Sequence, residues 1–300
     1  MKKAIGLIKL LRIKHYIKNG LVFLPLFFSM NLFNGDLFLR CILGFCAFCA
    51  ISSVVYIIND IRDVGKDRLH SKKRNRPIAS GLISVRLAFI TAVVLIGVAC
   101  FLLFMLGSVI GALFALLYVI VNILYSFGMK NIPIVDLILL VSGFVIRLLF
   151  GGVIAGISVS TWLFMTVICA AFYMGFGKRR GEILTEGENT REVNKLYSNE
   201  FLDQQMTVFM TLILVFYSLW CVIIIPESGF KNPGFEWSMI LVMLIFIRYT
   251  YNVKRSSDGD PVSVLLGDPM LIVLTLIYCI YITVVIYFPV GILHRIAELI

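Results

Sequence analysis

The sequence predicts an all-α integral membrane protein, and three observations support this fold class. The 300 residues are 60% hydrophobic with a mean hydropathy of +0.97, which excludes an ordinary soluble globular protein. Apolar runs of about 20 residues recur along the chain, and a helix needs about this length to cross a bilayer. Helices are expected because a lipid-exposed backbone must satisfy its own hydrogen bonds.

Nine apolar segments are long enough to span a bilayer, so we expect nine membrane-spanning helices. These segments are 17–34, 37–58, 84–105, 109–128, 133–154, 160–177, 206–225, 236–252 and 266–290. The N-terminal stretch MKKAIGLIKLLRIKHYIKN superficially resembles the start of a signal peptide. It lacks a small-residue cleavage site after the apolar core, so we interpret it as a basic leader into the first span. Residues 1–300 are expected to form a single transmembrane domain.

Basic residues indicate how the chain lies across the membrane. Of the 27 Lys and Arg residues, 23 gather on one side of the predicted spans, in the leader, in 62–86, around Lys130, in 178–195 and in 248–255. The positive-inside rule places this side in the cytoplasm, with the N-terminus inside and the C-terminus outside the cell. The long polar segments on the cytoplasmic side are about 59–83, 178–205 and 253–265. We therefore expect a multi-pass protein of the cell membrane whose chemistry takes place at its cytoplasmic face.

The sequence NDIRDVGKDR directly follows the second apolar segment and contains a cluster of oxygen-bearing side chains. Its members are Asn59, Asp60, Asp63 and Asp67. Spacings of three, four and seven residues predict that all four lie on one face of a helix. Carboxylates gathered on one face repel each other unless a cation lies between them, and Mg²⁺ is commonly shared between such carboxylates and substrate phosphates. The alternative is a solvated acidic helix end, which the poor helix propensity of Asp and Asn disfavours.

Basic residues follow the acidic cluster closely. They are Lys72, Lys73, Arg74 and Arg76. Carboxylates beside cations suit a pyrophosphate, because Mg²⁺ neutralises some of its oxygens and Arg or Lys binds the rest. The positive-inside signal alone explains Lys72 and Lys73, whereas Arg76, next to Pro77 in a predicted turn, is a candidate substrate ligand. His70 is a candidate for positioning a ligand.

Charge and cysteine content argue against a nucleic-acid-binding protein and against a cysteine metal site. The net charge of +10 comes from basic residues that alternate with membrane spans and share their loops with acids. Anionic lipid head groups and a phosphorylated substrate explain this pattern better than nucleic acid does. All seven cysteines lie in apolar segments, and Cys46 and Cys49 form a CxxC pair without a second Cys or His cluster. They are therefore expected to be packing residues.

The stretch NDIRDVGKDRLHSKKRNRPIASG resembles the first Asp-rich motif, NDxxDxxxD, of the UbiA-type intramembrane prenyltransferase superfamily. The resemblance implies a nine-transmembrane-helix bundle with a cytoplasm-facing central cavity, and it makes the single domain a catalytic one. More narrowly, the chain resembles the polyprenyl-phosphate phosphoribosyltransferase branch. The matching blocks are LRIKHYIKNGLVFLPLF, YSFGMKNIPIVDLILLVSGFVIRLLFGGVIAG, GKRRGE, RYTYNV and GDPVSVLLGDP, which together span nearly the whole chain.

A chemical observation favours the same branch. Enzymes that ionise a polyprenyl diphosphate typically carry a second Asp-rich cluster, often DxxxD. Between residues 100 and 200 the only Asp is Asp136, and Leu140 occupies the place of a second acid. One acidic cluster with extra cations suits 5-phosphoribosyl 1-diphosphate. Asp136 is a candidate for binding a ribose hydroxyl or a second metal ion, or it is a helix N-terminal charge after Pro133.

Two basic positions near predicted spans are further candidates. Arg147 lies inside the fifth segment, and an intramembrane Arg by default faces a polar cavity with a partner. We expect it to contact a phosphate or Asp136, the alternative being an inter-helix salt bridge. The family's GKR-x-x-E block implies that Lys178 and Arg179 bind phosphate, although stop-transfer charges look the same in a sequence.

The remaining candidates lie at the cytoplasmic ends of the first and fourth segments. The resemblance places Lys18 and Asn19 at the entrance of the cavity, with an interfacial anchor as the alternative. The same choice applies to Lys130, which follows Tyr125 at the end of the fourth segment.

The resemblance implies transfer of a 5-phosphoribosyl group from 5-phosphoribosyl 1-diphosphate to a polyprenyl (decaprenyl-type) phosphate, with release of pyrophosphate. Mg²⁺ would be held by the four residues of the NDxxDxxxD motif. The first alternative is a prenyltransferase that moves a polyprenyl group from its diphosphate to an aromatic acceptor. The second is a transporter or lipid-binding membrane protein, which the single mid-span charge and the lack of inverted repeats disfavour. Membrane lipid is an expected partner, nucleic acid is not, and the sequence leaves a homo-oligomer open.

Overall fold

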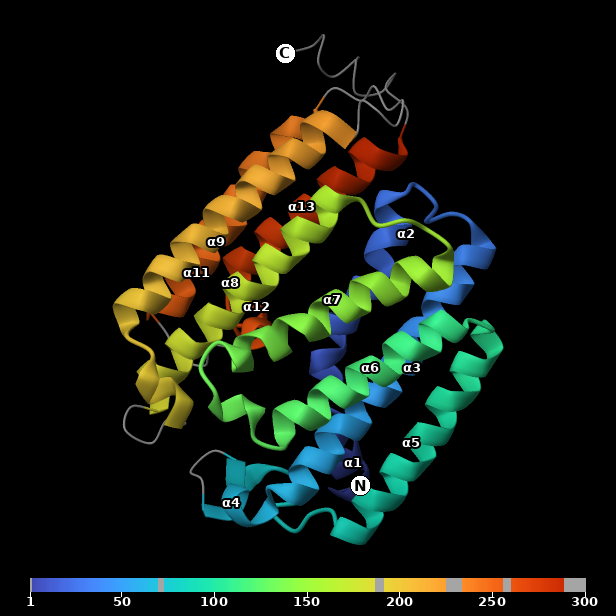
Figure 1. Cartoon of the computed structure of the whole chain (residues 1–300), viewed down its shortest axis with the longest axis vertical. Helices are drawn as coiled ribbons and strands as arrows, with labels where there is room; N and C mark the ends of the chain where they lie inside the picture. The colour runs from blue at the N-terminus through green and yellow to red at the C-terminus, as the bar shows by residue number, and fades with distance from the viewer. Residues whose placement is uncertain (1, 70–72, 187–191, 225–233, 256–259, 289–300) are drawn as a thin grey trace. The chain divides into compact units, whose positions relative to one another are not determined.

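The computed structural model describes residues 2–69, 73–186, 192–224, 234–255 and 260–288, whose regular structure is helical (Figure 1). Seven helices among these residues are long and apolar enough to cross a membrane. They are α3 (Gly35–Arg62), α5 (Val85–Leu106), α6 (Val109–Ser126), α7 (Val135–Ala155), α8 (Thr161–Glu186), α9 (Asn199–Leu219) and α13 (Pro269–Tyr287). The all-α membrane class is confirmed, and each of these helices overlaps a segment chosen from hydropathy, although α8 extends well past 177 and α9 begins before 206.

The two other predicted spans have a different structure. The segment 17–34 is not one α-helix, because a 3₁₀ helix, η1 (Ile13–Phe23), leads into the five-residue α2 (Leu24–Phe28). Pro25, the second residue of α2, lacks the backbone N–H that would continue a helix through this point. The segment 236–252 corresponds to α11 (Ser238–Arg255), which has 18 residues but three basic ones in its second half. Only seven of the nine expected helices therefore meet the requirements of a span in the described residues.

Short polar residues begin several of the spanning helices. Asn34, Ser84 and Ser108 each accept a hydrogen bond from the backbone N–H three residues later. Such a cap is worth about 1 kcal/mol because it satisfies a donor that has no partner within the helix. Gly107 ends α5 with φ of 61°, a conformation that glycine adopts without strain, and Ser108 starts α6 immediately.

The chain forms two compact units, one of residues 1–129 and 146–158, the other of residues 130–145 and 159–300. In the first unit α3 runs beside α5 and also contacts α6, η1 and α1 (Lys2–Leu11) (Figure 1). Its core joins Phe48 of α3, Tyr118 of α6 and Phe150 of α7. The short helix α4 (Val64–Leu69) follows α3, and a 3₁₀ turn, η2 (Lys73–Asn75), lies next to it.

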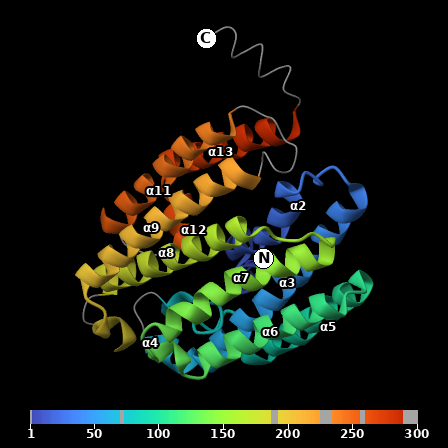
Figure 2. The ribbon, with the colours of Figure 1, turned by 45° about the horizontal axis from the view of Figure 1, so that its top comes forward.

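The second unit has an aromatic core. Helix α8 runs beside α9, and α11 contacts α8, α9 and α13 (Figure 2). The rings of Phe172 and Phe209 stack at 4.9 Å, and Tyr173 donates a hydrogen bond to the backbone oxygen of Phe246. Short helical pieces complete this unit: η3 (Met129–Asn131), η5 (Glu192–Leu196), the π-helical η6 (Trp220–Ile224), η7 (Phe235–Trp237) and α12 (Pro261–Leu266). Met129, the first residue of η3, belongs to the first unit.

A glycine in α7 allows close packing inside the first unit. A Cβ added to Gly151 would lie 2.2 Å from the backbone oxygen of Val22. Backbone atoms cannot move aside as a flexible side chain can, so Gly151→Ala is expected to destabilise the protein by about 1–3 kcal/mol. Thermal unfolding of purified protein measures the change. Gly97→Ala is the control, since nothing lies within 4 Å of a Cβ at that position of α5, and equal melting temperatures for the two variants would contradict the prediction.

Candidate functional site

The acidic motif is divided between two helices. Helix α3 ends at Arg62, Asp63 follows with φ of −89° and ψ of 5°, and α4 begins at Val64. The prediction that all four polar side chains share one helix is therefore wrong, because Asp67 lies on α4. Asp63 and Gly65 are both poor helix formers, which explains why the helix is interrupted here.

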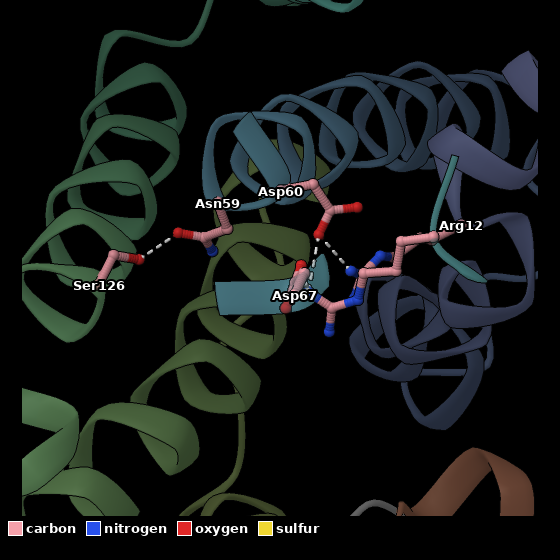
Figure 3. Close-up of polar contacts among 6 residues, drawn as sticks. Arg12, Asn59, Asp60, Asp67 and Ser126 are labelled. Atoms are coloured by element: carbon pink, nitrogen blue, oxygen red, sulfur yellow. Dashed lines mark hydrogen bonds and ion pairs between the residues drawn. The ribbon is translucent and has the colours of Figure 1, made fainter. Parts of the chain in front are cut away.

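One arginine, Arg76, nevertheless bridges Asp60 and Asp67, and a second arginine contacts Asp60. The side chains of both carboxylates are almost fully buried, with 2% and 6% of their surface exposed. Arg76 Nη1 lies 3.1 Å from Asp60 Oδ1 and 2.8 Å from Asp67 Oδ2, so one nitrogen bridges the two acids. Arg12 Nη2 donates to the same oxygen of Asp60 at 2.6 Å (Figure 3). The cluster of Asp60, Asp67, Arg12 and Arg76 is called the Asp–Arg cluster below.

Sequence reasoning missed Arg12. It lies between α1 and η1 with φ of 54° and ψ of 46°, in the left-handed region that non-glycine residues rarely adopt. Its guanidinium group lies 4.7 Å from the centre of the Tyr56 ring, a cation–π contact that helps to hold it over the end of α3. Its charge is part of the basic leader, so the sequence alone does not distinguish it from the positive-inside signal.

Asn59 points to the other side of α3. Its side-chain oxygen accepts a hydrogen bond of 2.5 Å from Ser126 Oγ at the end of α6 (Figure 3). Arg62 also donates to the backbone oxygen of Ser126, so the ends of α3 and α6 are tied together. Tyr125, the predicted substrate ligand next to Ser126, is half-buried, as is Asp63 at the bend. His70 and Lys72 lie outside the described residues.

The oxygens of the Asp–Arg cluster fit a hard cation. Among the described residues, no three His, Cys, Asp or Glu side chains gather in a group that could hold a metal ion by themselves. Mg²⁺, however, usually takes one or two carboxylates and completes its shell with water and substrate phosphate oxygens. Two buried carboxylates that already share one positive group meet this requirement.

Arg147 lies in a buried polar network of the first unit. Its Nε donates to Asn19 Oδ1 at 2.7 Å, and its Nη2 donates to the Tyr118 hydroxyl at 2.8 Å. The guanidinium group also lies 4.6 Å from the centre of the Tyr118 ring. Asn19, 1% exposed, further donates to Ser52 Oγ at 3.3 Å. Neutral partners thus stabilise the intramembrane charge, and the predicted phosphate contact of Arg147 stays a prediction.

A second cluster of ionic groups lies in the other unit. Asp136 in the first turn of α7 and Arg179 of α8 are both fully buried, and Arg179 Nε lies 2.7 Å from Asp136 Oδ2. Arg179 Nη1 also lies 2.6 Å from Glu182 Oε2, to which Asn194 donates at 2.9 Å. Asp136 was expected to bind a ribose hydroxyl or a second metal ion, or to contact Arg147, and its observed partner is Arg179.

Tyr197 completes this second cluster. Its hydroxyl donates to Asp136 Oδ1 at 2.8 Å and accepts from the backbone N–H of Ile134 at 2.5 Å. Burial, with the Asp136 carboxylate beside it, raises the pKa of Tyr197 to about 12, so the hydroxyl stays protonated at neutral pH. Glu182, Asn194 and Tyr197 were not among the predicted residues. Asp136 and Glu182 form a carboxylate pair in space that a search for DxxxD does not find.

A third polar group joins two of the blocks on which the family resemblance rests. Asp268 caps α13 and accepts hydrogen bonds from Arg248 Nε at 2.6 Å and Asn252 Nδ2 at 2.5 Å. The hydrogen bonds from Arg248, which has the larger effect, and from Asn252 hold the pKa of Asp268 well below its usual range. RYTYNV and the second GDP of GDPVSVLLGDP are thus in contact, a pairing that sequence reasoning did not predict. The remaining candidates, Lys18, Lys130 and Lys178, are half-buried.

Comparison with known proteins agrees with the family resemblance found in the sequence. The family model described as "UbiA prenyltransferase family" matches residues 22–274. The chain is 35% identical over 294 residues to the decaprenyl-phosphate phosphoribosyltransferase of Corynebacterium glutamicum, covering 94% of this chain and 87% of that protein. It is 30% identical over 296 residues to the enzyme of the same name from Mycolicibacterium smegmatis, covering 94% and 93%.

Solved structures show a similar fold. A UbiA homolog from Archaeoglobus fulgidus bound to DMAPP and Mg²⁺ superimposes with a TM-score of 0.69, covering 94% of this chain and 99% of that one. The two sequences are 15% identical, so this likeness concerns the fold. The same homolog bound to GPP and Mg²⁺ gives a TM-score of 0.67 at 16% identity, covering 95% and 99%.

Proposed function

Because the chain belongs to the UbiA prenyltransferase family, we propose that it transfers 5-phosphoribosyl from 5-phosphoribosyl 1-diphosphate to a polyprenyl (decaprenyl-type) phosphate and releases pyrophosphate. The chain is an enzyme, a transferase of this family within a multi-pass membrane fold. The observation that carries the proposal is the Asp–Arg cluster, in which two buried carboxylates meet guanidinium groups at the end of a spanning helix. The activity named for the relatives at 35% and 30% identity supports the choice of substrates.

The acidic motif is proposed to hold Mg²⁺ on the diphosphate of the donor. The ligands would be Asp60, Asp63 and Asp67, together with Asn59 once its side chain turns from Ser126 to the ion. When bound, the ion neutralises the negative charge that develops on the leaving pyrophosphate. The lipid phosphate is already an anion, so its oxygen attacks C1 of the ribose without a strong general base as the C1–O bond breaks.

Further basic side chains are proposed to bind the other phosphate groups. Arg76, Lys18, Lys130, Lys178 and Arg179 are the candidates for the 5-phosphate and the lipid phosphate, with Asn19, Tyr125 and Arg147 as further substrate-binding residues. For Arg179 and Arg147 this requires that a phosphate joins or replaces the partners described above. Asp136 is proposed to bind a ribose hydroxyl.

The orientation in the membrane is also part of the proposal. The N-terminus lies in the cytoplasm and the C-terminus outside, with η1–α2 and α11 completing nine crossings of the cell membrane around a cytoplasm-facing central cavity. This orientation lets a soluble sugar donor and a membrane-embedded lipid acceptor meet at the cytoplasmic face.

A substrate assay tests the proposed reaction. Purified protein with Mg²⁺, labelled 5-phosphoribosyl 1-diphosphate and polyprenyl phosphate is expected to form a labelled lipid and pyrophosphate in equal amounts. The second candidate is prenyl transfer from a polyprenyl diphosphate to an aromatic acid, which the Asp136–Glu182 pair favours as a second pair of acids in space. If only this second pair of substrates reacts, phosphoribosyl transfer is excluded.

A further inference from the structure

The Asp–Arg cluster is balanced in charge. Asp60 and Asp67 contribute two negative charges, and Arg12 and Arg76 contribute two positive ones. Both arginines donate to the same atom, Asp60 Oδ1. A carboxylate oxygen offers about two lone-pair sites, so these two guanidinium groups occupy both. A cation that binds this oxygen has to displace at least one of them.

The arginines are the members of the cluster that are able to move. The two carboxylates lie on helices and are almost fully buried, whereas the Arg12 and Arg76 side chains are 22% and 28% exposed. Arg12 lies in the connection between α1 and η1, and Arg76 lies between η2 and Pro77. Long side chains on connecting segments change rotamer more readily than carboxylates packed between helices.

We propose that Arg12 and Arg76 are exchangeable counter-ions, which compete with a divalent cation for Asp60 and Asp67 and pass to the diphosphate of the donor when it binds. The inference rests on the proposed function, because the competing cation is the Mg²⁺ proposed there. It adds Arg12 to the donor-binding residues and gives Arg76 two successive partners.

Charge balance explains why the exchange depends on the donor. A divalent cation alone would leave the buried cluster with two surplus positive charges, and the arginines would repel it. A diphosphate removes this surplus and offers the displaced guanidinium groups new oxygens, to which they bind in fork geometry. Metal and diphosphate therefore bind cooperatively, and the coupling is the same whichever binds first.

The test measures binding without turnover. The probes are Mn²⁺, followed by its electron paramagnetic resonance signal, and inorganic pyrophosphate, added to full-length protein in detergent. Arg12→Gln and Arg76→Gln each remove one competitor, so each is expected to bind Mn²⁺ alone about tenfold more tightly. The same variants are expected to bind pyrophosphate about tenfold more weakly in the presence of Mn²⁺, because one phosphate ligand is lost.

Tighter binding of Mn²⁺ together with weaker binding of pyrophosphate identifies an arginine as an exchangeable counter-ion. An arginine that only supported the fold would weaken both affinities when replaced. Arg40→Gln is the matched control, because Arg40 lies at the other end of α3 and donates to the backbone oxygen of Ile154. It is expected to leave both affinities unchanged. A glutamine variant that does not fold is replaced by Lys at the same position, for which the same two changes are expected at smaller size.

Two results would overturn the inference, and only the second would also overturn the proposed metal site. If the unaltered protein binds Mn²⁺ while neither arginine variant binds it more tightly, the exchange is wrong and the proposed metal site stands. If the unaltered protein binds no Mn²⁺ with or without pyrophosphate, the metal site of the proposed function is wrong and the exchange falls with it.

Discussion

Asp67→Asn is expected to lower phosphoribosyl transfer by about a thousandfold while the protein inserts and folds normally. Asp67 is buried on α4, and its carboxylate shares Arg76 with Asp60. The amide keeps the shape of the side chain but removes the charge that is proposed to hold Mg²⁺ on the leaving diphosphate. A metal site with one carboxylate fewer stabilises the transition state less, so the loss falls on kcat as well as on kcat/KM.

Initial rates of labelled lipid formation at several Mg²⁺ concentrations measure this effect. Asp36→Asn is the control, because Asp36 lies exposed in the first turn of α3, at the opposite end from the motif. Asp63→Ala extends the measurement to the bend between α3 and α4. Full activity of both Asp63→Ala and Asp67→Asn would remove the metal site from the proposal, whatever the substrates are.

Hydropathy and spacing predict part of this molecule because they report local physical requirements. A run of about 20 apolar residues has few stable states other than a spanning helix, so seven of the expected spans appear as such helices in the part of the chain that the structure describes. The segment 17–34 is also rich in apolar residues, but hydropathy does not distinguish one α-helix from η1 followed by α2. Pro25 is a local signal of the break.

The candidate site is less predictable, since its contacts join residues that are distant in the sequence. The spacing of Asn59, Asp60, Asp63 and Asp67 assumes a continuous helix, and the bend after Arg62 breaks this assumption. Asp60 and Asp67 still meet, because Arg76 draws them together from the following connection. Arg12 reaches Asp60 from the N-terminal leader, where its charge looks like any other positive-inside residue.

The second cluster illustrates the same limit. In the sequence, Arg179 is one of three consecutive basic residues at the end of an apolar run, a pattern typical of stop-transfer charges. In the structure it is fully buried between Asp136 and Glu182, while its neighbour Arg180 pairs with a partly exposed Asp203. Only the folded structure distinguishes the buried Arg179 from the partly exposed Arg180.

Arg179→Met is therefore expected to lose about 3–5 kcal/mol of folding stability and to yield little folded protein. Removing the guanidinium group takes away the positive group that the buried carboxylates of Asp136 and Glu182 both contact. Arg180→Met is the matched control, because its pair with Asp203 is partly exposed and worth about 0–1 kcal/mol. Thermal unfolding followed by size-exclusion chromatography in detergent measures both variants.

A combined variant separates charge from packing. If the cost of Arg179→Met is the unpaired negative charge, then adding Asp136→Asn and Glu182→Gln should recover most of the lost stability, because a buried ionic group replaced as a whole by neutral groups is often tolerated. If the triple variant is as unstable as Arg179→Met, the arginine acts through its size and shape instead. Recovery of stability without recovery of activity would show that this cluster also serves catalysis, since the neutral triple variant keeps the fold but lacks the charges of Asp136 and Arg179.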